Sequence, residues 1–85
     1  MNTVKSRILD SICYTELVYG RINKKLKTGM GREQIETFIY SAINETAEEY
    51  FRRQGKNIYI TCKKNKIVVT VNSSTRRVIT VDAIL

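Results

Sequence analysis

The stretch that decides the fold is residues 57–83, which read NIYITCKKNKIVVTVNSSTRRVITVDA. Apolar side chains occupy every second position in three segments of this stretch, and polar or basic residues separate the segments. A period of two is the pattern of strands that bury one face. The stretch therefore predicts a three-stranded antiparallel sheet at the C-terminal end of the chain. The alternating residues are Ile58, Ile60 and Cys62, then Ile67, Val69 and Val71, then Ile79, Val81 and Ala83.

The spacing of these residues also predicts how the strands pair. A two-residue turn at Lys64–Asn65 puts the apolar residues of the first two strands on one face, which makes that register self-consistent. A three-residue loop at Ser73–Thr75 then sets the third strand. The predicted pairs are Cys62–Ile67, Ile60–Val69 and Ile58–Val71 in the first hairpin, and Val69–Ile79 and Lys66–Asp82 in the second.

Helical periodicity precedes the sheet. Apolar residues three or four apart predict an amphipathic helix within residues 4–13 and a second within residues 17–26, with a break near Thr15. Residues 32–54 keep a helical period throughout, Glu48 and Glu49 precede Arg52 and Arg53 by four positions, and Gly55 follows as a stop. We therefore expect one long helix there.

These elements predict an α+β fold, in which two short N-terminal helices and one long helix pack on a C-terminal three-stranded antiparallel sheet. A chain of 85 residues has room for one domain, residues 1–85. The long helix is expected to cover the apolar face of the sheet. The expected core contacts join Ile39, Ala42, Ile43 and Ala47 to Ile60, Val69 and Ile79.

The composition excludes several classes of protein. The chain has no histidine, which removes Ser-His-Asp triads, Cys-His pairs and ordinary zinc sites, and it has no phosphate-binding or dinucleotide fingerprint. We therefore expect no enzyme activity, no metal and no cofactor. Cys13 and Cys62 are far apart in sequence, which favours two reduced and mostly buried thiols. No apolar run is long enough to span a membrane, so we expect a cytoplasmic protein.

The net charge of +7 is distributed unevenly. Residues 1–28 and 55–85 are strongly basic, whereas residues 29–54 are acidic, and Asp82 is the only acid of the last third. Such asymmetry is typical of proteins with a polyanionic partner, although basic side chains also protect sheet edges from aggregation.

Two groups of residues are candidates for binding that partner. Arginine can grip phosphate in a bidentate manner and tyrosine can stack on a base, so the basic residues of the sheet and the tyrosine between them predict a surface for a nucleotide-like ligand or a nucleic acid. A loop with two glycines and an arginine at a helix start is a weaker candidate for phosphate, because many loops between helices have this composition. The first group is Tyr59, Lys63, Lys66, Arg76 and Arg77, and the second is Gly29, Gly31 and Arg32.

Three segments of the chain are similar to a known family. Residues 12–18 (ICYTELV) with 21–26 (RINKKL), residues 55–60 (GKNIYI) and residues 77–82 (RVITVD) resemble a family of small bacterial proteins that is known only as a domain of unknown function. The resemblance implies a stand-alone domain in bacteria or their mobile elements, and it assigns no catalytic or binding residue.

Size and charge together predict a non-enzymatic binding protein for an anionic partner, with a sequestering or regulatory role. The alternative is a protein-binding inhibitor, antitoxin-like or directed against a defence system, that acts on an acidic protein surface. A small core, an apolar second sheet face and a free strand edge further predict a homo-oligomer.

Overall fold

The computed structural model of the chain describes residues 3–84. The helices come first and the strands follow, which confirms the α+β class. In chain order the elements are α1 (Val4–Ser11), α2 (Glu16–Leu26), α3 (Arg32–Asn44), the 3₁₀ helix η1 (Glu48–Tyr50), β1 (Phe51–Gln54), β2 (Asn57–Cys62), β3 (Ile67–Asn72) and β4 (Val78–Ala83).

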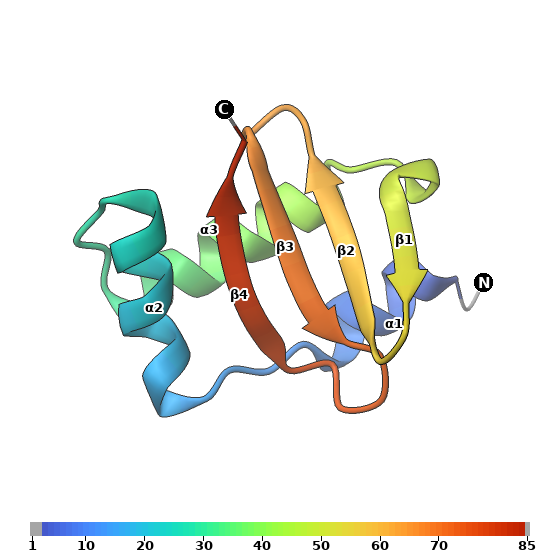
Figure 1. Cartoon of the computed structure of the whole chain (residues 1–85), viewed down its shortest axis with the longest axis horizontal. Coiled ribbons are helices and arrows are strands. Elements are labelled where there is room, and N and C mark those ends of the chain that lie inside the picture. The colour runs from blue at the N-terminus through green and yellow to red at the C-terminus, as the bar shows by residue number, and fades with distance from the viewer. Residues whose placement is uncertain (1–2, 85) are drawn as a thin grey trace.

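The four strands form one antiparallel sheet in the order β1-β2-β3-β4. Helices α1 and α3 lie behind this sheet in Figure 1, and α2 lies beside β4. In the part of the chain that the structure describes, no helix covers the opposite face of the sheet (Figure 1). The β2–β3 loop and the β3–β4 loop lie at opposite ends of the sheet, which places residues 63–66 far from residues 73–77 (Figure 1).

The sheet has four strands and not the expected three, and residues 32–54 do not form one long helix. Helix α3 ends at Asn44, and Thr46 is buried with its hydroxyl donating to the Ala42 carbonyl at 2.7 Å. Residues 51–54 form strand β1 instead of a last helical turn. Gly55, with a φ of 64°, makes the turn that joins β1 to β2, so this residue ends a strand and not a helix.

The predicted pairing of β2 with β3 is confirmed, since Cys62, Ile60 and Ile58 face Ile67, Val69 and Val71. The predicted pairing of β4 is wrong by one residue at Val71, which pairs with Val78, and by two residues at Val69. A bulge between Thr70 and Val71 shifts the register. The observed pairs are therefore Val69–Val81 and Val68–Asp82, in place of Val69–Ile79 and Lys66–Asp82.

The core lies between α3 and the sheet. Helix α3 turns Ile35, Ile39, Ala42 and Ile43 inward at helical spacing, and none of these side chains is exposed. Ile60 and Val69 at the centre of the sheet belong to the same buried cluster, as expected. Two expected members do not: Ala47 follows the end of α3 and is exposed, and Ile79 lies at the bulge and is half-buried.

The two edges of the sheet differ. The outer edge of β4 is partly closed, because Cys13 pairs its backbone with Arg76 and Val78 at 3.1 and 2.9 Å. The Arg21 guanidinium donates to the Ile79 carbonyl at 3.2 Å on the same edge. Within residues 3–84 no strand pairs with the outer edge of β1, so the backbone of Phe51–Gln54 is open to another chain.

Both cysteines are free thiols, but only Cys62 is buried, whereas Cys13 is exposed. Burial raises the pKa of the Cys62 thiol. Across residues 3–84, every helix is too short or too polar to cross a membrane.

Candidate functional site

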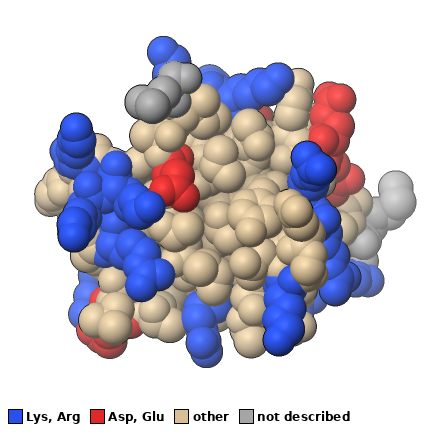
Figure 2. Space-filling view, viewed as in Figure 1, with Lys and Arg blue, Asp and Glu red and all other residues tan. Residues whose placement is uncertain are grey.

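The uncovered face of the sheet is uncharged at its centre. Because Ile58, Ile60 and Cys62 point into the core, the intervening Tyr59 and Thr61 point to the opposite face. Figure 2 shows this face, with uncharged surface across its middle and Lys and Arg side chains around its margins. The β3 and β4 residues beside Tyr59 and Thr61 on this face are Val68, Thr70 and Thr80.

Side chains on this face are packed closely against one another. Thr70 is only 5% exposed although no helix covers it, so its neighbours on the sheet shield it. Tyr59 is half-buried on the central strand β2. The face is therefore closely packed, with the ring of Tyr59 near its middle.

Arg52 lies next to that ring. The register pairs Arg52 on β1 directly with Tyr59 on β2, and directly opposite residues have neighbouring side chains on the same face. Arg52 is exposed. Arg52 was not among the residues predicted to bind a ligand, because residues 32–54 were expected to form a helix. Gly55–Lys56 forms the turn of the hairpin, but a glycine at this point of the sequence is equally compatible with the end of a helix.

The single acid of the four strands is neutralised. Asp82 on β4 pairs with Lys25 of α2, whose ammonium lies 2.9 Å from the carboxylate. Both side chains are about half exposed, so the pair contributes little to stability. Its effect on the face is to cancel the charge that would repel a polyanion.

The β2–β3 loop places three lysines at one end of the sheet. Lys63 lies over the ring of Tyr50, with 4.5 Å from its ammonium to the ring centroid. Lys64 pairs with Glu45 at 2.6 Å, and this contact holds the pKa of the Glu45 carboxyl below its usual value. Lys66 is exposed and forms no ion pair within residues 3–84.

The β3–β4 loop places Arg76 and Arg77 at the other end. Six residues of β3 separate this loop from Lys66, which corresponds to about 20 Å of strand. Arg76 has a left-handed backbone, with a φ of 58°, and lines a pocket on the helix-covered side of the sheet. Arg77 instead lines a shallow depression between α2 and β4. The five residues of the first candidate group therefore do not form one compact site.

The second candidate group is occupied by contacts within the chain. Asn23 accepts from the Met30 N–H through its Oδ1 at 3.0 Å and donates to the Met30 carbonyl at 2.9 Å. The Gly31 N–H donates to the Gln34 side chain at 2.9 Å. These bonds use the backbone N–H groups of Met30 and Gly31, two of the donors in the loop that was expected to hold a phosphate.

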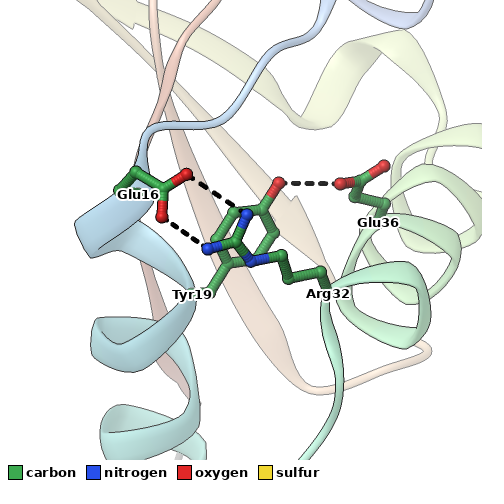
Figure 3. Close-up of polar contacts among 4 residues, drawn as sticks. All are labelled: Glu16, Tyr19, Arg32 and Glu36. Atoms are coloured by element: carbon green, nitrogen blue, oxygen red, sulfur yellow. Dashed lines mark hydrogen bonds and ion pairs between the residues drawn. The ribbon is translucent and has the colours of Figure 1, made fainter.

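Arg32 is held by Glu16 of α2 through two hydrogen bonds of its guanidinium (Figure 3). These bonds raise the pKa of Arg32 above its usual value. The guanidinium also lies 5.1 Å from the centroid of the Tyr19 ring. Arg32 is thus a link between α2 and α3.

The Tyr19 hydroxyl completes this link by donating to Glu36 of α3 at 2.7 Å (Figure 3). The pKa of Tyr19 is raised to about 12. Desolvation is the largest cause, and the hydrogen bond to the Glu36 carboxylate is the second. Tyr14 stacks on Tyr19 with 5.5 Å between ring centroids. Burial raises the pKa of the Tyr14 hydroxyl even more than that of Tyr19. Neither tyrosine is suited to act as a base near neutral pH.

Within residues 3–84, no three His, Cys, Asp or Glu side chains are grouped as metal ligands would be.

Comparison with known proteins identifies the family and nothing beyond it. No curated protein and no solved structure matches the chain. A family model described as "Protein of unknown function (DUF3781)" matches residues 6–82, which confirms the resemblance to an uncharacterised family. The match covers nearly all of the 85 residues. The chain therefore belongs to the DUF3781 family of proteins of unknown function.

Proposed function

We propose that this protein binds single-stranded nucleic acid across the uncovered face of its sheet. The observation that carries the proposal is the Arg52–Tyr59 pair on a closely packed face that is uncharged at its centre and has basic residues at both ends. Sheets that bind single strands combine aromatic side chains, on which bases stack, with basic side chains that follow the backbone.

A polymer suits this face better than a nucleotide-sized ligand. Lys63 and Lys66 at one end are separated from Arg77 at the other end by about 20 Å of strand. A single nucleotide cannot contact both ends, whereas a strand of several nucleotides can cross the face and contact both. In this arrangement Tyr59 stacks on a base and Arg52 contacts the adjoining phosphate.

The proposed role is non-enzymatic. The face offers threonines, valine, tyrosine and basic side chains, and the chain has no histidine to exchange protons near neutral pH. A small basic domain that covers a few nucleotides in the cytoplasm is suited to sequester a nucleic acid or to regulate access to it.

Two measurements test the proposal. The absorbance ratio of the purified protein at 260 and 280 nm reports whether nucleic acid co-purifies. Fluorescence anisotropy with a labelled single-stranded oligonucleotide, and with its duplex as the control, then measures affinity as salt is raised. Preference for the single strand and a steep loss of affinity with salt are expected. Absence of binding at about 50 mM salt and tens of micromolar protein would contradict the proposal.

The open edge of β1 supports a second candidate, an inhibitor that binds an acidic protein segment. An extended segment can add a strand to a free edge, and β1 presents Arg52 and Arg53 with no acid among its residues. A synthetic peptide of alternating Glu and Val is the probe, with a Lys and Val peptide as control. Protection of the 51–54 amides from hydrogen exchange by the acidic peptide alone would favour this candidate over the first.

A further inference from the structure

A pocket of about 340 Å³ lies on the side of the sheet that the helices cover. Helix α1 forms one wall, η1 and the strands β1 and β2 form another, and the β3–β4 loop closes the end. The pocket is separate from the uncovered face, because it lies across the sheet from Tyr59. Its lining residues are Val4, Arg7, Ile8, Glu48, Phe51, Arg53, Ile58, Ser73 and Arg76.

Three arginines from three different elements line this pocket. Arg7 comes from α1, Arg53 from β1 and Arg76 from the β3–β4 loop. None of the three forms an ion pair within residues 3–84. Glu48 is the one acid in the lining, and its carboxylate accepts only a long bond of 3.4 Å from the Lys5 N–H. The pocket therefore has an excess of positive charge and unused donors.

The arginine side chains of the pocket keep guanidinium N–H groups that can bind an oxyanion. Arg76 uses one Nη1 bond, at 2.8 Å, to the Ser74 carbonyl. Arg53 makes a weak bond of 3.4 Å from its Nε to the Gly55 carbonyl. The other guanidinium N–H groups of both residues, and the whole guanidinium of Arg7, are left for a ligand. A planar guanidinium presents paired donors that match the oxygens of a phosphate.

The loop that carries Arg76 is fixed by hydrogen bonds. The Asn72 side chain accepts from the Ser74 and Thr75 N–H groups at 2.8 and 2.9 Å. The Ser73 N–H donates to the Lys56 carbonyl at 2.8 Å, which ties this loop to the turn after β1. Arg76 has a left-handed backbone, which glycine would adopt without strain. Because an arginine occupies the position despite this strain, we infer that its side chain has a role. Two of the three arginines are thus held on connected elements.

Apart from Ser73, the rest of the lining is apolar. Val4, Ile8, Phe51 and Ile58 cover the pocket floor and wall, and Phe51 is a half-buried aromatic ring. A pocket of this volume with apolar walls and a few convergent polar groups is typical of sites for small organic ligands. Inorganic phosphate alone would leave the apolar walls uncovered.

We propose that this pocket binds a small organic phosphate whose body carries an aromatic ring, of the class of the nucleoside monophosphates. The phosphate lies among Arg7, Arg53 and Arg76, and the body lies against Phe51 and its apolar neighbours. Glu48 accepts a hydrogen bond from a hydroxyl or amino group of the ligand body and opposes the phosphate charge. This site is independent of nucleic-acid binding on the uncovered face.

Isothermal titration calorimetry tests the proposal with the four ribonucleoside monophosphates, the matching nucleosides and inorganic phosphate. At least one monophosphate should bind with a dissociation constant below about 1 mM, and more tightly than its nucleoside or inorganic phosphate. Arg7→Ala and Arg76→Ala should each weaken binding roughly tenfold. Lys24→Ala, which removes the same charge from an exposed position on α2, is the matched control and should bind as the wild type does.

The variant Glu48→Gln tests whether the three arginines bind a ligand or only stabilise the fold. Removing the opposing carboxylate should strengthen binding of the monophosphate several-fold, and circular dichroism should show each variant folded. The proposal is overturned if no monophosphate saturates the wild type below about 1 mM. It is equally overturned if the folded arginine variants bind as the wild type does, or if inorganic phosphate binds as tightly as the nucleotides.

Discussion

Arg52 on β1 lies directly opposite Tyr59 on β2, on the face of the sheet that no helix covers. The pair sets a cation beside an aromatic ring that is half-buried and firmly placed. A base stacked on the ring would bring its phosphate near the guanidinium. The two contacts differ in chemistry, because stacking is insensitive to salt whereas the phosphate contact is not.

Replacing Tyr59 with alanine should therefore weaken binding of single-stranded nucleic acid roughly tenfold without changing its salt dependence. Tyr59→Phe should bind as the wild type does, because the ring remains. Tyr40→Ala is the matched control, since Tyr40 is a 47% exposed tyrosine on α3. Fluorescence anisotropy measures all three variants, and equal affinity of Tyr59→Ala and Tyr40→Ala would remove Tyr59 from the site.

The sheet could be predicted from the sequence where alternation is strong. In residues 57–72 a slip of one position would turn every apolar side chain to the wrong face, so only one register is self-consistent and the structure has it. Strand β4 was found but misaligned, because Ile79 follows Val78 and both residues are apolar. That pattern does not indicate on which side of a bulge each residue falls.

Strand β1 could not be predicted, for a physical reason. Tyr50 and Phe51 continue the helical spacing of α3, and the four residues of β1 bury too little surface to show a period of their own. Gly55 is as suitable after a helix as in a hairpin turn, so it does not distinguish the two. Because β1 was not predicted, Arg52 and Arg53, which lie on this strand, were not predicted as site residues either.

Arg76 and Arg77 were predicted to contact the same ligand, but their side chains line different pockets. Arg76 has the left-handed conformation that few residues other than glycine adopt, so nothing in its identity predicts that it lines a different pocket from Arg77. The direction of Tyr59, in contrast, follows from alternation alone.

Ile43→Asp should unfold the domain. The side chain of Ile43 is fully buried between α3 and the sheet, and aspartate there would be an unpaired charge in the core. Thr37→Asp, at an exposed position of the same helix, should unfold at nearly the urea concentration of the wild type. Urea titration followed by circular dichroism measures both, and a cooperative transition for Ile43→Asp would show that this face of α3 is not essential to the core.

Stability should fall at high pH because of Tyr19. The pKa of Tyr19 is about 12 in the folded protein and near 10 when unperturbed, since the neutral hydroxyl donates to Glu36. The contribution of this group is complete below pH 10 and is lost as the pH rises from 10 towards 12. Urea denaturation across this range should show the advantage of the wild type over Tyr19→Phe shrinking. An advantage that does not change with pH would contradict the role of the hydrogen bond.

Self-association stays a prediction, and the open edge of β1 gives it a test. Twofold antiparallel pairing of two β1 strands would bring Arg52 or Arg53 of one copy opposite the same residue of the other, and like charges opposite each other destabilise a sheet. Added salt screens this repulsion, so sedimentation equilibrium should show the dimer fraction rising with salt. A species of 9.8 kDa at every salt concentration would contradict self-association, and a dimer that weakens with salt would contradict pairing through β1.

Single substitutions of Arg76 and Arg77 should have opposite consequences, because the two residues serve different surfaces. Arg77 is exposed at the β3–β4 end of the sheet, in the depression between α2 and β4, so Arg77→Ala should weaken single-strand binding and reduce the slope of log affinity against log salt by about 0.7. It should leave binding of a nucleoside monophosphate unchanged. Arg76 lines the pocket behind the sheet, so Arg76→Ala should weaken monophosphate binding and leave the single strand unaffected. The two variants remove equal charge from adjacent positions, and each is the control for the other. Equal losses of both ligands in both variants would show that this end of the sheet acts as one diffuse basic surface, and that neither ligand has a site of its own.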